Sequence, residues 1–438
     1  MPRTPFLCFV VLALTVIACK TTEGDASNTN EPDSGTPETP DAAKPDDDAG
    51  PAYTLLPSAK AKQVASGVQS TCALTTDGAV RCWGGSDHGQ LGNGAPFESD
   101  GSPVPVQVTG LTSGVQMIDV GGDFACAVTA EGAVKCWGID ETGQLGTGIA
   151  YTDTRTQASN VPVPVKGITA GAVAVAVGAS SACAIVSGGN VKCWGLDEAG
   201  KLGNDSPKLA GDGLPTFVPP VDVVGISGAV QISVGNRHAC AVLATGALKC
   251  WGSNSRGTLG IGTEDPYKSI PVDVTALGTT VVSVEAGENE TCAILKSGAL
   301  KCWGQGDDGY LGDGATGIIR HVLLPQDVLG ATAGATSISL KGFACAALSG
   351  ATRCWGKRAE IGTADVDGFE TYAPAKEAVG LGTGSQAVSV GAYHACTFTV
   401  SGAIKCWGRN GQGQLGNGKP SNGGTARDSQ PVSVLSFP

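Results

Sequence analysis

The chain has 438 residues, of which 66 are glycine and 24 are proline, and its formal net charge is −12. This glycine and proline content, spread among short apolar runs, favours many short strands and tight turns over a mainly helical fold. The acidic balance gives no support to nucleic-acid binding, which requires basic patches. We therefore expect an all-β protein without a nucleic-acid partner.

Residues 1–18 have the features of a signal peptide. Arg3 is followed by a mainly apolar run at 6–18, which is too short to cross a membrane comfortably. Residues 16–19, Val-Ile-Ala-Cys, resemble the lipobox of bacterial lipoproteins, in which the cysteine is acylated and becomes the mature N-terminus. The resemblance implies a lipid on Cys19 and a location on the periplasmic or cell-surface side of the bacterial envelope. An ordinary cleaved signal is the alternative.

Residues 19–57 are predicted to be the lipidated N-terminus followed by an acidic tether. Between 20 and 51 the chain is rich in Asp, Glu and Pro and has almost no large apolar side chain. Such a segment cannot bury a core and stays solvated. We expect the folded domain to occupy residues 58–438.

That domain is built on seven copies of one thirteen-residue stretch. The first runs from Cys72 to Gly84, CALTTDGAVRCWG, and all seven tryptophans lie in the copies, 52 to 57 residues apart. If residues 76–78 form a turn, each copy is a β-hairpin in which the two cysteines lie opposite each other. The register leaves apolar residues on both faces, so both faces can pack.

Cysteine pairing follows from this register. Apart from Cys8 in the signal and Cys19, the chain has two cysteines in each repeat and none left over. An exported protein lies where disulfides persist. A zinc site is the competing interpretation, but its ligands are usually closer together in sequence. The predicted disulfide cysteines are Cys72, Cys82, Cys126, Cys136, Cys183, Cys193, Cys240, Cys250, Cys292, Cys302, Cys345, Cys354, Cys396 and Cys406.

Each repeat contains four strands in a fixed order. A short apolar strand precedes the cysteine hairpin, and a Gly-Gln-Leu-Gly element and a proline-led strand follow it. Seven such units bury their faces only by stacking on one another, and a closed ring leaves no exposed end. We expect the C-terminal proline-led strand at 431–435 to close the ring by pairing with the N-terminal repeat. An open solenoid is the rival arrangement.

This order of parts resembles the repeat of the regulator of chromosome condensation family across residues 58–438. The resemblance implies a seven-bladed β-propeller of four-stranded blades. It also matches His238 and His394 to a histidine that is usual in that family, but the other five repeats carry Ser, Phe or Glu there. We interpret the position as packing or turn structure. Guanine-nucleotide exchange, known from nuclear members, is not carried over to an exported chain with paired cysteines.

The sequence gives little indication of catalysis. The four histidines have no metal-ligand spacing, and Pro420 stands where a phosphate-binding loop needs Ser or Thr. We expect no catalytic residue, cofactor or metal, although a propeller can assemble a site from distant residues. A basic residue precedes every second hairpin cysteine, as in Arg81. These residues form either a ring that attracts an acidic partner or stems packed on neighbouring methyl groups.

Variable connections are the best candidates for a binding surface. Long examples lie at 149–160, 205–217 and 419–430, between the Gly-Gln-Leu-Gly element and the proline-led strand. Loops on a rigid scaffold often carry function. The sequence therefore predicts a monomeric, surface-anchored, non-enzymatic protein that binds a protein or glycan through these loops. Inhibition of a secreted enzyme and a structural role in the envelope are the alternatives.

Overall fold

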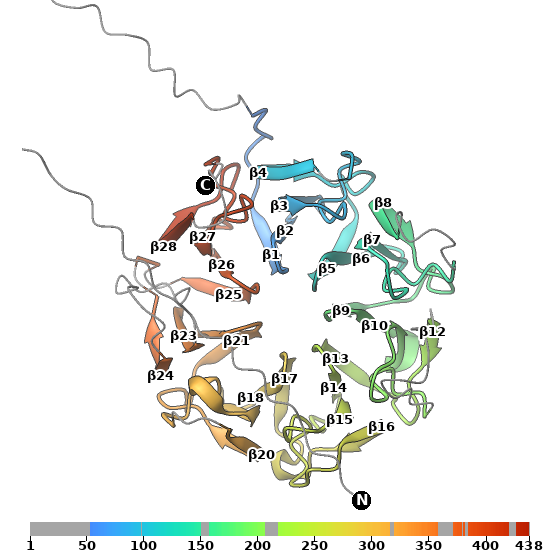
Figure 1. Ribbon diagram of the computed structural model, residues 1–438, viewed down its shortest axis with the longest axis vertical. Helices are drawn as coiled ribbons and strands as arrows, with labels where there is room; N and C mark the ends of the chain where they lie inside the picture. The colour runs from blue at the N-terminus through green and yellow to red at the C-terminus, as the bar shows by residue number, and fades with distance from the viewer. Residues whose placement is uncertain are drawn as a thin grey trace, which may run out of the picture. The chain divides into compact units, whose positions relative to one another are not determined.

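The computed structural model describes residues 53–97, 99–149, 157–205, 218–315, 319–357, 371–378, 380–381, 384–419 and 426–437. These residues form seven four-stranded antiparallel sheets, set as blades around a central axis (Figure 1). The predicted all-β, seven-bladed propeller is confirmed. The helical turns in these ranges are 3-10 turns of three residues, η1 (Ser187–Gly189), η2 (Thr275–Leu277) and η3 (Asp307–Gly309). Within the same ranges, no helix reaches the length and hydrophobicity needed to cross a bilayer.

Each repeat supplies one blade, whose strands run outward from the axis in chain order. The inner strands are β1 (Ala61–Ser66), β5 (Val115–Val120), β9 (Ala174–Val177), β13 (Ala229–Val234), β17 (Val281–Ala286), β21 (Ala335–Leu340) and β25 (Ser385–Val390). The second strands are β2 (Ser70–Thr75), β6 (Phe124–Thr129), β10 (Ser181–Val186), β14 (His238–Leu243), β18 (Glu290–Leu295), β22 (Ala344–Leu348) and β26 (His394–Thr399). The third strands are β3 (Val80–Ser86), β7 (Val134–Ile139), β11 (Asn190–Gly195), β15 (Leu248–Ser253), β19 (Leu300–Gln305), β23 (Ala351–Lys357) and β27 (Ile404–Arg409). The outer strands are β4 (Ser99–Gln107), β8 (Ala158–Pro164), β12 (Val218–Asp222), β16 (Tyr267–Asp273), β20 (His321–Asp327), β24 (Thr371–Glu377) and β28 (Arg427–Ser433).

The second and third strands form the predicted cysteine hairpin. In the first blade Cys72 lies opposite Cys82, and Gly78 takes the left-handed φ of +85° that the turn requires. The sixth hairpin has a two-residue turn, Ser349 and Gly350, and both residues have positive φ. A turn of this kind matches the twist of a two-strand ribbon.

Neighbouring blades pack through opposite faces of these hairpins. Cys72, Leu74, Val80 and Cys82 of the first blade share a buried core with Trp137 of the second. On its other face, the first blade packs Ala73 and Trp83 against the seventh blade. Each hairpin therefore contributes to two interfaces, as the period-2 pattern predicted.

The Gly-Gln-Leu-Gly element couples each blade to the next one. In the first blade, the carbonyl oxygen of Gln90 accepts a 3.0 Å hydrogen bond from the indole nitrogen of Trp137. Gly92 lies directly against the same ring, where a Cβ would come within 2.7 Å of Trp137 Cδ1. In the sixth repeat the corresponding residues, 359–362, lie outside the described part of the chain.

Polar side chains join the inner strands of adjacent blades. The side-chain amide of Gln63 donates to the carbonyl oxygen of Ile118 at 2.7 Å and accepts from the backbone nitrogen of Ile118 at 3.1 Å. Ser389 Oγ accepts from the backbone nitrogen of Ser66 at 2.8 Å, across the junction between the seventh and first blades. These contacts fix the inner strands around the axis.

The ring closes differently from our expectation for the C-terminal strand. β28 pairs with β27 of its own repeat, and β4 completes the first blade, so no strand is exchanged between the terminal repeats. The reason is that every repeat carries its outer strand after its hairpin, which makes each repeat a whole blade. Closure uses other contacts: Trp83 Nε1 donates to Gln414 O at 2.9 Å, and Ala59 N donates to Ser436 O at 2.9 Å.

Candidate functional site

Antiparallel pairing places two sets of connections on one face of the ring, here termed the loop face. One set joins each inner strand to the second strand, and the other joins the third strand to the outer strand. The two sets touch in the first blade, where Gly85 N donates to Gln69 O at 2.9 Å. They touch again in the second blade, where Ile139 N donates to Asp123 O at 2.9 Å. Hairpin turns such as 76–78 lie on the opposite face.

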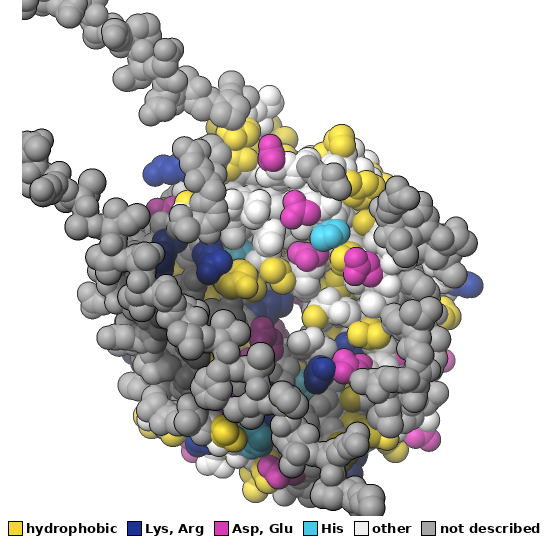
Figure 2. Space-filling view, viewed as in Figure 1, with side chains coloured by type: hydrophobic (Ala, Val, Ile, Leu, Met, Phe, Trp, Pro, Cys, Tyr) yellow, Lys and Arg dark blue, Asp and Glu magenta, His cyan; other side chains and the backbone are white. Residues whose placement is uncertain are grey.

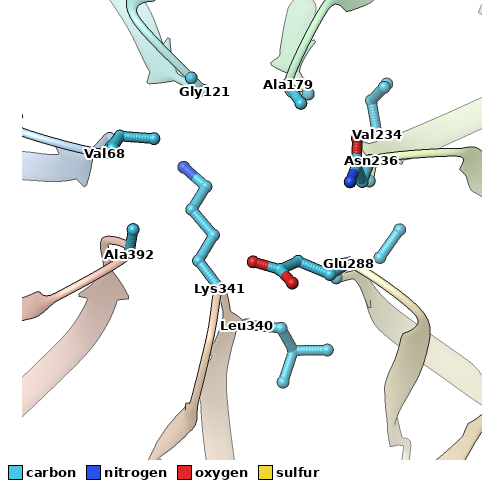
Figure 3. A pocket seen from close by; sticks show the side chains of 14 residues that line it. Val68, Gly121, Ala179, Val234, Asn236, Glu288, Leu340, Lys341 and Ala392 are labelled. Atoms are coloured by element: carbon cyan, nitrogen blue, oxygen red, sulfur yellow. The ribbon is translucent and has the colours of Figure 1, made fainter. Parts of the chain in front are cut away.

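At the loop face, the inner strands end around a cavity of about 100 Å³ on the axis, here termed the axial cavity. All seven blades contribute to its lining. Figure 3 labels nine of the lining residues, namely Val68, Gly121, Ala179, Val234, Asn236, Glu288, Leu340, Lys341 and Ala392.

Backbone hydrogen bonds run from blade to blade around this cavity. They are Val68 N to Gly122 O (3.2 Å), Gly122 N to Gly178 O (3.2 Å), Asn236 N to Gly287 O (3.0 Å) and Ala392 N to Gly67 O (3.2 Å). The last of these crosses the junction between the seventh and first blades. The rim of the axial cavity is therefore a part of the ring that holds its blades together.

The side chain of Lys341 extends across the axial cavity (Figure 3). Lys341 follows β21 in the sixth repeat, and its ammonium group donates to the carbonyl oxygens of Ser66 at 2.6 Å and Val120 at 2.5 Å. Lys341 was not among the candidate residues predicted from the sequence. The sequence does mark it, because the other six repeats have a glycine at the corresponding position.

A second, polar cavity of about 220 Å³ lies on the same face, between the fourth, fifth and sixth blades. Its lining includes Arg256, Glu288, Glu290 and Tyr310. Glu290 occupies the repeat's histidine position and is buried. Burial raises the pKa of Glu290 to about 7, against a backbone hydrogen bond from Asn289 that favours the charged form, and the negative charge of Glu288 adds to the rise.

The predicted binding loops leave the loop face but lie mostly outside the described residues. Of the segments 149–160, 205–217 and 419–430, the structure describes 149, 157–160, 205, 419 and 426–430. The strands that flank them are placed: β7 and β8, β11 and β12, and β27 and β28. All three segments are connections from a third strand to an outer strand. On the described part of the face in view, Figure 2 shows acidic, basic and apolar side chains interspersed.

All fourteen predicted hairpin cysteines form disulfides within their own blades. The bonds are Cys72–Cys82, Cys126–Cys136, Cys183–Cys193, Cys240–Cys250, Cys292–Cys302, Cys345–Cys354 and Cys396–Cys406. Their Cα atoms are 4.0–4.1 Å apart and the cysteines are fully buried, or nearly so. This pairing confirms the hairpin prediction. The signal at 1–18, Cys19 and most of the tether at 19–57 lie outside the described residues, and their assignment stays a prediction.

Four of the basic residues before the second hairpin cysteines have contacts within the protein. Lys192, Lys249 and Lys301 form ion pairs of 2.7, 2.8 and 2.9 Å with an aspartate on the adjacent outer strand. Arg81 donates to the carbonyl oxygen of Pro57 at 2.7 Å and lies over the ring of Phe437. Their charges are therefore partly neutralised, which weakens the hypothesis of a ring that attracts an acidic partner.

His238 and His394 lie at interfaces between blades, where each is buried. His238 Nε2 lies 2.7 Å from Thr291 Oγ1, and His394 Nε2 lies 2.7 Å from Thr71 Oγ1. Burial lowers the pKa of His238 to about 4 and that of His394 to about 3, with the positive charges of Lys201 and Lys341 as the respective second causes. Both rings are therefore neutral structural groups near pH 7. Among the described residues, no group of three or more His, Cys, Asp or Glu is placed to hold a metal ion.

Comparison with known proteins agrees with this architecture. The family model of the RCC1-like domain matches residues 20–340, and that of the regulator of chromosome condensation (RCC1) repeat matches residues 386–414. Human E3 ubiquitin-protein ligase HERC2 is 30% identical over 364 residues, which are 81% of this chain but only 6% of HERC2. The ultraviolet-B receptor UVR8 of Arabidopsis thaliana is 28% identical over 374 residues, which cover 83% of this chain and 80% of the receptor.

Solved structures show the same fold. The crystal structure of Prp20p from Saccharomyces cerevisiae has a TM-score of 0.66 at 18% identity and covers 86% of this chain and 87% of its own. Human WBSCR16 has a TM-score of 0.54 at 17% identity and covers 87% of this chain and 84% of its own. The repeat, the ring of seven blades and a family match over more than half of the sequence lead to one conclusion: the chain belongs to the RCC1-like domain family.

Proposed function

We propose that this protein is exported, is anchored to a membrane through a lipid on Cys19, and binds a partner protein on the loop face without catalysing a reaction. The observation that carries the proposal is the contrast between the blades and their connections. Every blade has the same four strands and a buried disulfide. The connections from the third strand to the outer strand differ in length, and all of them leave from the loop face. A rigid scaffold with variable loops on one side is a common arrangement for binding.

Two further observations support the proposal. Seven buried disulfides suit an oxidising compartment outside the cytoplasm. Prp20p, which has the same fold, is described by its binding properties to Gsp1p and histones. That likeness supports protein binding as a class of function, and the partner of this chain is a separate question because fold alone does not fix function.

The test compares three forms of the full chain as baits in chemical cross-linking and mass spectrometry. In the first variant, short Gly-Ser linkers replace 149–157 and 419–426 on the loop face. In the control, Glu131→Lys and Lys296→Glu reverse two exposed charges at hairpin turns of the opposite face. We expect a partner that the wild type and the control retain and the loop variant loses. Equal retention by all three forms, or loss only in the control, would contradict the proposal.

A further inference from the structure

The polar cavity on the loop face contains two positions at which the fifth repeat departs from the other repeats. Glu290 is the only acidic residue at the histidine position, where the other repeats have Ser, Phe or His. Tyr310 is the only aromatic residue at the second position of the Gly-Gln-Leu-Gly element. Both residues line the polar cavity, whose volume is about 220 Å³. One water needs roughly 10–15 Å³ of such space, so the cavity has room for a small organic molecule.

The carboxylate of Glu290 lacks the partner that the histidines have. His238 and His394 each contact a threonine of the following blade, but the sixth repeat has Ala344 at the threonine position. Glu290 is only 4% exposed. Among the described residues, its carboxylate accepts one hydrogen bond, which runs from the backbone nitrogen of Asn289 to Oε2 at 2.9 Å. The other oxygen, Oε1, can therefore accept a hydrogen bond from a ligand in the cavity.

Arg256 brings the opposite charge to the same cavity. It lies in the connection between β15 and β16 of the fourth blade and is partly buried. It forms no ion pair with any described residue, and so none with Glu288 or Glu290. Glu288 of the fifth blade is exposed and also lines the axial cavity (Figure 3). Positive and negative groups thus line one cavity without pairing with each other.

This combination of charges indicates the class of ligand. A ligand with only a positive charge is repelled by Arg256, and one with only a negative charge is repelled by the two glutamates. A small molecule that carries both an ammonium group and a carboxylate can pair with both kinds of side chain. Arginine binds a carboxylate through two parallel hydrogen bonds, and a glutamate accepts hydrogen bonds from an ammonium group. Tyr310 adds an aromatic wall to the cavity.

We propose that the polar cavity binds a free α-amino acid, with its ammonium group at Glu290 and Glu288 and its carboxylate at Arg256. The residues that line the cavity come from the fourth, fifth and sixth blades, and none of them belongs to the connections 149–160, 205–217 or 419–430. The site therefore stands independently of the partner protein proposed for those connections. It gives the protein a second ligand of a different chemical class.

Glu290 also makes binding depend on pH. Burial raises its pKa to about 7, and a ligand ammonium group pairs with the charged form. The other charged or titratable residues that line the cavity or adjoin its lining are Arg256, Glu288, Asp307, Tyr310 and Lys341. The charged fraction of Glu290 rises from roughly one-tenth at pH 6 to roughly nine-tenths at pH 8, so the affinity for an amino acid should rise about tenfold over that range.

Equilibrium dialysis of the full chain with radiolabelled L-serine tests the class of ligand. Two molecules of similar size each lack one of the charges: ethanolamine is serine without the carboxylate, and 3-hydroxypropionate is serine without the ammonium group. At pH 8 we expect saturable binding of one serine per chain, and competition by either single-charge molecule that is weaker by about tenfold or more. Absence of saturable serine binding, or competition by either molecule as strong as that of unlabelled serine, overturns the proposal.

Conservative variants test whether serine binds in the polar cavity. Glu290→Gln and Arg256→Gln each remove one charge at nearly constant volume and should lower the affinity at pH 8 by about tenfold or more. The controls Glu141→Gln and Arg427→Gln remove exposed charges that do not line the cavity and should bind serine like the wild type. Full affinity in either cavity variant, or the same loss in the controls, overturns the assignment to this cavity.

The pH dependence tests the role of Glu290 in the wild type, without any substitution. The wild-type affinity for serine should rise about tenfold between pH 6 and pH 8, because the charges of serine itself do not change over that range. The residual affinity of Glu290→Gln should not change with pH. A wild-type affinity that is constant or falls between pH 6 and pH 8 contradicts an ammonium group bound at Glu290.

Discussion

His394 Nε2 lies 2.7 Å from Thr71 Oγ1, across the interface where the last blade meets the first. The same pair recurs between His238 and Thr291, and there Thr291 Oγ1 donates to Thr258 O at 2.7 Å, so the histidine nitrogen is the donor. The other five repeats have alanine where Thr71 and Thr291 stand. A threonine therefore occurs only in the two repeats that follow a histidine-bearing repeat.

This pairing predicts a loss and a recovery of stability at the closing interface. Thr71→Ala leaves a buried N–H of His394 without its partner and should lower the free energy of unfolding by about 1–3 kcal/mol. Adding His394→Phe recreates the Phe and Ala combination that packs between Phe343 and Ala395, and should recover most of that loss. Urea unfolding monitored by tryptophan fluorescence measures both variants. Thr76→Ala, at an exposed hairpin turn, is the control and should be near neutral; a double variant as unstable as Thr71→Ala would refute the pairing.

The contact between Gly92 and Trp137 predicts that alanine destabilises the protein more at Gly92 than at Gly110. Gly92 and Gly110 have similar positive φ values of +63° and +69°, but a Cβ would strike Trp137 only at Gly92 and meets nothing within 4 Å at Gly110. Alanine at either site should cost about 1 kcal/mol from backbone strain. At Gly92 the clash should add about 1–3 kcal/mol. Equal losses in chemical unfolding of the two alanine variants would show that the glycine does not couple the blades.

Burial of Glu290 predicts a pH dependence of stability that Glu290→Gln removes. The pKa of Glu290 is raised from 4.5 to about 7, so the folded state binds a proton more tightly than the unfolded state. Its contribution is therefore fully present below pH 4.5 and is lost as the pH rises through 7, a change on the order of 3 kcal/mol.

The variant isolates this effect from that of the histidines. The pKa values of His238 and His394 are lowered in the folded state, so their effect on stability has the opposite sign. Their contribution to the free energy of unfolding is lost as the pH falls below 6.5. The wild type should gain stability relative to Glu290→Gln between pH 8 and 4.5, while the exposed Glu141→Gln control should follow the wild type. A constant difference between wild type and Glu290→Gln across that range would rule out the titration.

The predicted lipid on Cys19 can be tested on the intact cell. If Cys19 is acylated, the wild-type protein should partition with membranes and carry the mass of a lipidated N-terminus. Cys19→Ser should appear in the soluble fraction with the propeller still folded, because the change lies outside the domain. Wild-type protein that is soluble and has an unmodified N-terminus would favour the ordinary cleaved signal instead.

Local features of the fold could be predicted from sequence because they recur in every repeat. The cysteines fix the hairpin register, Gly78 and its counterparts fix the turns, and the Trp positions mark one packing face. The closing strand was predicted wrongly because the N-terminal repeat was compared with what precedes it, whereas its own outer strand, β4, follows it.

Contacts between blades were harder to foresee. Thr71 and His394 are 323 residues apart, and Lys341 reaches Ser66 from 275 residues away, so no local spacing indicates either contact. The available signals were departures from the repeat, namely a threonine in place of alanine and a lysine in place of glycine. In a ring of near-identical units, such departures mark the places where one interface differs from the rest.

Each of the seven blades is closed by a disulfide between the two cysteines of its own repeat. Thiol titration of the mature, unreduced protein in denaturant tests this directly, with a second titration after full reduction. We expect no reactive thiol among the fourteen hairpin cysteines before reduction and all fourteen after it, together with mass-mapped bonds between the two cysteines of each repeat. Free thiols in the unreduced protein, or bonds that join different repeats, would contradict the account.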